Sequence, residues 1–285
     1  MSTESSGQEK AFDQAAERVT FENRLDSLFI ENNYKFIIDL CKQPHADYLQ
    51  SACTYNLIGT YYFLGDSVAC WKLLNKEITR IQSNADADAY SLDNLLDKDY
   101  TAYKKFLLNS TAKNYILCHI DSFYMTEPIS DKEHGMKLLH LLIEDHWVRR
   151  TSSLYDHFKP ERRHLLSSRM DSVQAIQAQR DHATRVFDFY KTQSKVFSKG
   201  EVGRIYYWQL LLFFHEQDLT RRSFYHELVK QGVKDGAFNI ENQMNFEIGT
   251  EYKKMGPNEF SLQREKIQEE YRKKYSLPNF RIRLM

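Results

Sequence analysis

Residues 201–250 read EVGRIYYWQLLLFFHEQDLTRRSFYHELVKQGVKDGAFNIENQMNFEIGT, and they give the most information about the expected fold. From Ile205 to Phe214 the chain is apolar or aromatic apart from Gln209, which predicts a helix from about Val202 to Gln217 that is covered on nearly all sides. A second helix is predicted between Thr220, a suitable N-cap, and Gly232, which suits a helix end. Helices joined by so short a turn must pack against each other.

The segment after Gly236 shows a different period. Apolar residues alternate with polar ones at Phe238 and Ile240, and again at Met244, Phe246 and Ile248, a spacing typical of strands. Two helices followed by two short strands predict a winged-helix-like α+β unit over residues 201–250. A charged C-terminal helix is expected within 251–285, at about 261–275.

The N-terminal half is predicted to consist of helical hairpins. One hairpin has arms at 55–62 and 68–81, with Gly65 in the turn. It resembles a tetratricopeptide unit at Leu57, Tyr61, Gly65, Cys70 and Leu74, although Thr54, Ile58 and Gln82 depart from that pattern. No regular repeat is visible, so we expect irregular hairpins stacked as a solenoid.

These patterns define the expected domain organisation. Residues 1–15 are predicted to be a disordered tail, 16–148 an acidic helical-hairpin region, and 149–200 a basic linker followed by a long helix. Ser130 and Glu133 are expected to form a capping box that starts a helix ending near residue 148. The fold class is therefore mainly α, with one small α+β unit near the C-terminus.

Residues 201–250 also resemble the winged-helix end of the PCI domain, a module of scaffold subunits in large complexes. The resemblance is carried by Leu228, Val229, Gly232, Val233, Gly236, Phe238, Ile240, Phe246 and Ile248, while Asn239 and Glu241 depart from it. It implies a non-catalytic subunit that binds other protein subunits through wing strands, with Phe238, Ile240, Phe246 and Ile248 at the paired edge. The alternative is that these four residues only close the domain's own core.

Composition restricts the remaining possibilities. The net charge is zero, but residues 1–148 hold 14 Lys/Arg against 22 Asp/Glu, and 149–285 hold 25 against 17. No apolar leader and no membrane-length apolar run is visible, which predicts a cytoplasmic or nuclear protein without a membrane span. The four cysteines form no CxxC pair and are expected to be reduced core thiols.

Catalytic and metal-binding patterns are weak. Five histidines lie between His134 and His164, but their spacing does not place three ligands on one helix face. No GxSxG, HExxH or GxxxxGKS motif occurs. We therefore expect no cofactor, no metal and no catalytic residue, although an enzyme site assembled from distant positions stays open as an alternative.

The competing functional hypothesis is nucleic-acid binding by the basic C-terminal half. In this hypothesis phosphates, or an acidic partner, would contact the following side chains: Arg149, Arg150, Arg162, Arg163, Arg221, Arg222 and Lys230. The sequence does not decide between this hypothesis and a protein scaffold, nor does it identify a complex.

Overall fold

The computed structural model describes residues 3–84, 89–96, 98, 100–157 and 172–276, and every regular element in these ranges is a helix. The prediction of a mainly α protein is confirmed. The chain divides into two compact units, Met1–Thr126 (unit 1) and Glu127–Met285 (unit 2).

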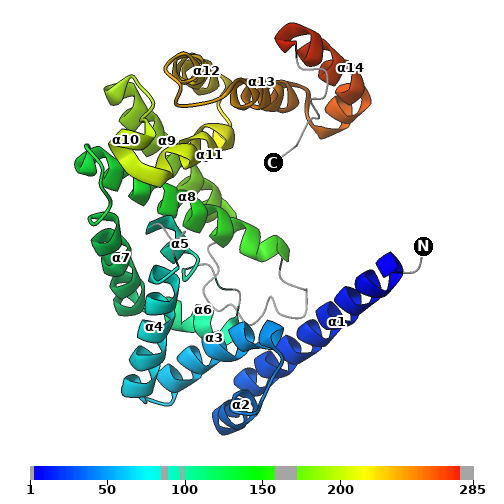
Figure 1. Ribbon diagram of the computed structural model, residues 1–285, viewed down its shortest axis with the longest axis vertical. Coiled ribbons are helices and arrows are strands. Elements are labelled where there is room, and N and C mark those ends of the chain that lie inside the picture. The colour runs from blue at the N-terminus through cyan, green and yellow to red at the C-terminus, as the bar shows by residue number, and fades with distance from the viewer. Residues whose placement is uncertain (1–2, 85–88, 97, 99, 158–171, 277–285) are drawn as a thin grey trace. The chain divides into compact units, whose positions relative to one another are not determined.

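The helices of unit 1 form successive hairpins (Figure 1). They are α1 (Thr3–Ile30), α2 (Tyr34–Cys41), α3 (Asp47–Phe63), α4 (Ser67–Gln82), α5 (Ala89–Asp93), α6 (Thr101–Leu107) and α7 (Ser110–Tyr124). Helix α1 covers most of the segment predicted to be disordered. The hairpin predicted with arms at 55–62 and 68–81 is present as α3 and α4, with Gly65 at φ 77° in the turn.

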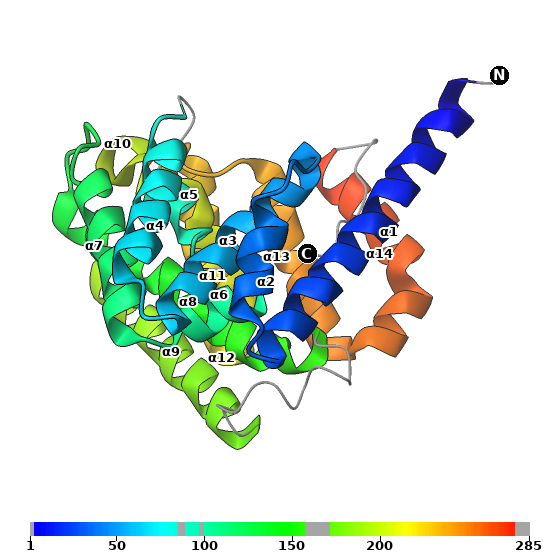
Figure 2. The ribbon, with the colours of Figure 1, turned by 90° about the horizontal axis from the view of Figure 1, so that it is seen from below.

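The first helices of three hairpins, α1, α3 and α6, run parallel. Phe29 meets Phe63 at 5.3 Å between ring centroids, while the Tyr48 hydroxyl donates to Glu17 nearer the start of both helices. Tyr62 meets Phe106 at 5.2 Å. Helices α1, α2 and α3 lie side by side in Figure 2, as expected for stacked hairpins.

Gly59 sets the close approach of α3 and α6. A Cβ at this position would lie 2.3 Å from the backbone of Ala102, so a larger residue would force the helices apart. Around this crossing, Tyr55, Tyr103 and Phe106 are fully buried. Three large rings and a backbone contact therefore make the centre of unit 1.

The described helices of unit 2 follow one another from α8 to α14. They are α8 (Lys132–His157), α9 (Ser172–Gln193), α10 (Lys199–Val202), the 3-10 helix η2 (Gly203–Trp208), α11 (Gln209–His215), α12 (Leu219–Lys234), α13 (Ile240–Met255) and α14 (Pro257–Tyr275). Helix α8 packs on α9, whereas α12, α13 and α14 pack in succession (Figure 1).

The apolar helix expected from Val202 to Gln217 is divided into three parts. Gly203, at φ 70°, ends α10, and a 3-10 turn leads into α11. Gln209, the polar residue of this stretch, is fully buried: its amide nitrogen donates to the Phe197 carbonyl at 2.8 Å, and its oxygen accepts from the Phe197 N–H at 2.9 Å. It thereby fixes the preceding loop onto α11.

The structure also corrects two smaller predictions, one on the residue that caps α8 and one on the burial of the cysteines. Asp131, rather than Ser130, caps α8 by accepting from the His134 N–H, and the Ser130 hydroxyl donates to the Gly200 carbonyl instead. All four cysteines are free, but Cys118 is exposed, so only Cys53 and Cys70 are fully buried core thiols.

Candidate functional site

The four residues predicted to form a wing edge lie in a helix and in the turn before it. Phe246 and Ile248 are buried in α13, Ile240 is its first residue, and Phe238 lies in the turn after α12. Within the described residues no strand is present, so the α+β unit predicted over 201–250 is wrong. These side chains offer no strand edge to a partner.

Two features of the sequence explain this helix. Asn239 and Asn242 form a reciprocal cap, in which the side chain of each accepts from the backbone N–H of the other at 2.9 Å. Met244 and Ile248 are also four residues apart, and both enter a core with Phe260 and Ile267 of α14. Phe246 points to another neighbour, Phe214 of α11, at 5.7 Å. Because α13 is buried on more than one side, its apolar positions imitate strand alternation.

Arg222 is an internal residue. Its side chain is 1% exposed, and it donates to Thr250 Oγ1 at 3.0 Å and to the carbonyls of Phe213, Phe214, Glu216 and Phe246 at 3.1–3.3 Å. Burial lowers the pKa of Arg222 to about 10, which still leaves it charged at neutral pH. The guanidinium satisfies the carbonyls at the end of α11 and joins α12 to α13.

The other described basic candidates also contact this chain. Arg149 pairs with Asp145 at 3.0 Å, and Arg221 donates to Thr184 Oγ1 at 3.1 Å. Lys230 pairs with Glu227 at 2.8 Å. Arg162 and Arg163 lie outside the described residues; the Arg150 backbone belongs to α8, and its side chain is not described. Arg149, Arg221 and Arg222 all reach His215 or Glu216, and Arg222 is buried there, so among the described residues these cations bind groups of the chain itself.

A cluster of acids and histidines joins α8, α9 and α11. Asp145 accepts from His215 Nδ1 at 2.6 Å and lies 3.4 Å from Nε2 of the buried His182, whose Nδ1 is 3.2 Å from Glu144. Burial alone would raise the pKa of Asp145, but the contacts with His182 and His215 and the charge of Arg149 hold it well below its usual range. The sequence showed the histidines but could not show that distant carboxylates pair with them.

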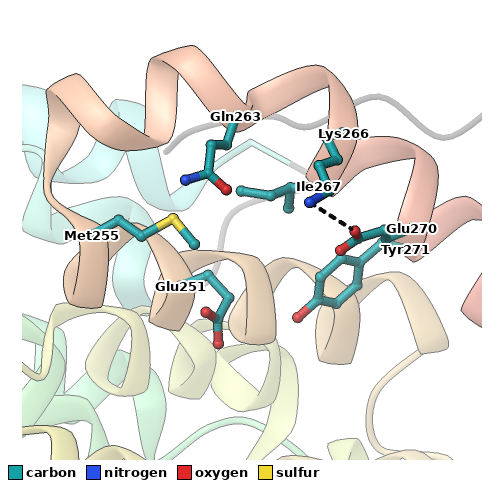
Figure 3. A pocket seen from close by; sticks show the side chains of 7 residues that line it. All are labelled: Glu251, Met255, Gln263, Lys266, Ile267, Glu270 and Tyr271. Atoms are coloured by element: carbon teal, nitrogen blue, oxygen red, sulfur yellow. Dashed lines mark ion pairs between the residues drawn. The ribbon is translucent and has the colours of Figure 1, made fainter.

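A shallow pocket of about 180 Å³ lies between α13 and α14. Figure 3 shows Glu251 and Met255 of α13 facing Gln263, Ile267 and Tyr271 of α14. Lys266 and Glu270 pair at its rim at 3.9 Å. The mixture of one ion pair and an apolar floor gives a groove without a nucleophile beside a base.

The most distinctive surface is one end of unit 1, which we call the apolar end. It consists of six exposed apolar side chains at the turns that connect α1 to α2, α3 to α4 and α6 to α7: Ile30, Phe36, Phe63, Leu64, Val68 and Leu108. Val68 is 77% exposed and Leu108 59%. Exposed residues of this size are common singly but need an explanation when they gather.

Contacts beneath the apolar end show that its three turns are neighbours. Phe29, just before Ile30, meets Phe63 at 5.3 Å, and Tyr62 meets Phe106 at 5.2 Å. The Asn109 amide also donates to the Tyr62 hydroxyl at 2.5 Å. The surface was missed in the sequence because its residues come from three separate turns, and a turn position gives no periodic signal.

Comparisons with known proteins add no relative: no family model, no curated protein and no solved structure matches this chain. Among the described helices none has the length and apolarity needed to cross a bilayer. The same residues contain no group of three or more histidine, cysteine or acidic side chains arranged to hold a metal ion.

Proposed function

We propose that this protein is a non-catalytic adaptor that binds another protein through the apolar end of unit 1. The observation that supports the proposal is the gathering of six large apolar side chains, each 40–77% exposed, at three adjacent turns. Burying such side chains against a partner contributes on the order of 25 cal/mol per Å² of apolar surface. Apolar and aromatic residues grouped in this way are typical of the centre of protein interfaces.

The parallel arrangement of α1, α3 and α6 supports this proposal. Stacked hairpins present the same end of successive helices in one row, and helical-repeat proteins use such extended surfaces to bind partners. Aromatic contacts hold the three turns in place, so the surface exists before a partner arrives. A preformed surface costs less conformational entropy on binding.

The PCI resemblance and the nucleic-acid hypothesis have less support. The resemblance stays a prediction, but the edge pairing that it implied needs strands at 238–248, where the described chain is turn and helix. The basic-face hypothesis needs free cations, whereas Arg149, Arg221 and Arg222 all make contacts within the chain. The non-catalytic assignment is supported by the structural use of the Asp145 cluster, which joins three helices.

The test compares a variant of the apolar end with a matched control. Phe36→Ser together with Val68→Asp removes two of its most exposed side chains, at 56% and 77%. Leu262→Asp makes the same kind of change at an 89% exposed leucine of α14, a helix of unit 2. Each protein is used to capture companions from native extract, and the recovered companions are purified and titrated against it.

We expect a purified companion to bind the parent and Leu262→Asp alike, and to bind Phe36→Ser/Val68→Asp at least about tenfold more weakly. Circular dichroism should show the same helix content in all three proteins, because the changed side chains are exposed. A companion that binds all three with equal affinity would overturn the proposal. So would an activity on a small substrate that survives the double change.

A further inference from the structure

A second hollow in unit 1, which we call the polar pocket, lies away from the apolar end. Its volume is about 450 Å³, and it is lined by Tyr55 of α3, Arg80 and Ile81 of α4, Asn84 just after α4, Ser91 and Asn94 in and after α5, and Lys98. Arg80 is twelve residues from Val68 along α4, a separation of about 18 Å at 1.5 Å per residue. The two surfaces are therefore distinct.

The lining of the polar pocket is rich in hydrogen-bond donors. Arg80 and Lys98 carry positive charge, and among the described lining residues none is a carboxylate. Asn84 and Asn94 carry side-chain amides, and Ser91 and Tyr55 carry hydroxyls. Groups of these kinds surround bound anions in proteins, because each can direct an N–H or O–H at a negatively charged oxygen.

Tyr55 provides a second, independent observation. Its side chain is 1% exposed, and its hydroxyl has no hydrogen-bond partner although it is buried. Leaving a buried hydroxyl unpaired costs about 1–3 kcal/mol, and a ligand oxygen within reach of the Tyr55 hydroxyl would remove this cost. Burial, followed by the nearby charge of Glu77, raises the pKa of Tyr55, so the hydroxyl stays protonated and is available as a donor.

The cations at the pocket are only partly neutralised. Arg80 pairs with Glu77 at 2.9 Å, which uses part of its charge. Lys98 lies with its Nζ 5.5 Å from the centroid of the Tyr55 ring. Burial lowers the pKa of Lys98, and the positive charge of Arg80 lowers it further, while the charge of Glu77 raises it. Cations that repel one another are stabilised by an anion placed between them.

We propose that the polar pocket binds a phosphate monoester, with Arg80 and Lys98 on the phosphate and the Tyr55 hydroxyl as a buried donor. A phosphate monoester carries about −1.5 to −2 charge at neutral pH and three strong acceptor oxygens, which suits two cations and several neutral donors better than a carboxylate does. The volume exceeds that of the phosphate group, and Ile81 and the Tyr55 ring offer apolar surface for the organic part of the ligand.

The test is a titration of the full-length protein, followed by amide NMR shifts, with three probes. Phenyl phosphate and benzoate share a ring and differ in the anionic group, so they separate phosphate from carboxylate. A phosphoserine peptide separates a phosphorylated protein segment from a free phosphate monoester. We expect phenyl phosphate to bind with shifts centred on residues 55, 80–84 and 91–98, and to bind at least about tenfold more tightly than benzoate.

Matched variants locate the binding. Tyr55→Phe should weaken phenyl phosphate binding about tenfold, since a donor to a charged oxygen is lost, while protein stability stays the same or rises because an unpaired buried hydroxyl is removed. Tyr103→Phe is its control, because the Tyr103 hydroxyl is equally buried and unpaired but does not line the pocket. Arg80→Gln should weaken binding at least tenfold, and Lys76→Gln, on the exposed face of α4, should not.

Three results would overturn the proposal. The first is equal affinity for phenyl phosphate and benzoate, and the second is that neither phenyl phosphate nor the phosphoserine peptide binds. The third is an equal loss of affinity for phenyl phosphate in Tyr55→Phe and Tyr103→Phe. Tighter binding of the peptide than of phenyl phosphate would place the ligand on a partner protein. The reverse order would identify a free phosphate monoester. Since no residue of the apolar end is changed, failure here leaves the proposed adaptor function intact.

Discussion

Arg222 has a buried structural role that its residue type does not suggest. In the sequence it follows Arg221 on a helix and suggests a phosphate contact. In the structure it is buried and donates hydrogen bonds to carbonyls at the end of α11 and within α13. The sequence could not reveal this role, because all its acceptors except Thr250 Oγ1 are backbone carbonyls, which any residue type would provide.

We predict that Arg222→Met lowers the free energy of unfolding of unit 2 by about 3 kcal/mol or more, because it leaves buried carbonyls without donors while keeping most of the side-chain volume. Amide hydrogen exchange in α11, α12 and α13 measures this free energy. Arg221→Met is the control; its side chain is 27% exposed, so a loss of at most about 1 kcal/mol is expected. Equal losses in the two variants would contradict the prediction.

Helix α13 shows which part of the fold the sequence determines. The mainly helical class, the α3–α4 hairpin and the C-terminal helix were predictable, since their apolar residues follow a helical period. The strands predicted at 238–248 were wrong because burial on several sides of α13 removed the polar face that marks a helix. The capping pair at Asn239 and Asn242 was a local signal for a helix start, and it was the better guide.

The candidate site was less predictable than the fold. The apolar end combines residues from three turns, and the polar pocket combines residues from α3, α4 and α5 with Lys98. No periodic pattern connects such positions along the chain. Their proximity follows from the parallel packing of α1, α3 and α6, which depends on contacts such as the one between Gly59 and Ala102.

Glu247 connects three helices and gives a prediction on pH. Its carboxylate accepts from Lys274 and Tyr275 of α14 at 2.6 Å and lies 2.8 Å from His226 Nε2 of α12. Burial alone would raise the pKa of Glu247, but these hydrogen bonds, with one from Gln243, lower it to about 2. A glutamate in an unfolded chain has a pKa of about 4.3.

Because the folded pKa lies below the unfolded value, the stabilisation by Glu247 is fully present above about pH 4.3 and is lost as the pH falls toward about 2. The loss amounts to at most about 3 kcal/mol. We expect Glu247→Gln to destabilise α14 at neutral pH and to flatten this acid dependence, measured by urea unfolding at a series of pH values. Glu269→Gln, at an exposed pair with Lys273, should leave the dependence unchanged.

At the scale of the whole molecule, the chain divides after Thr126 into two units. Unit 1 has its own core around Tyr55, Tyr103 and Phe106, and unit 2 has one around Tyr190, Phe197 and Phe213. The backbone just after the division belongs to unit 2, since the N–H groups of Ser130 and Asp131 donate to the carbonyls of Gly200 and Glu201. A unit with its own core and its own backbone pairing can fold without the other.

We predict that a protease site inserted between Thr126 and Glu127 can be cleaved while both halves stay folded. Each purified fragment should keep its helical circular dichroism and unfold cooperatively with urea, because no core side chain is removed from either unit. A fragment that loses its helix signal would show that its core depends on the other unit. If both fragments fold, the adaptor proposal assigns the captured companion to the fragment with residues 1–126, and the fragment with 127–285 should not bind it.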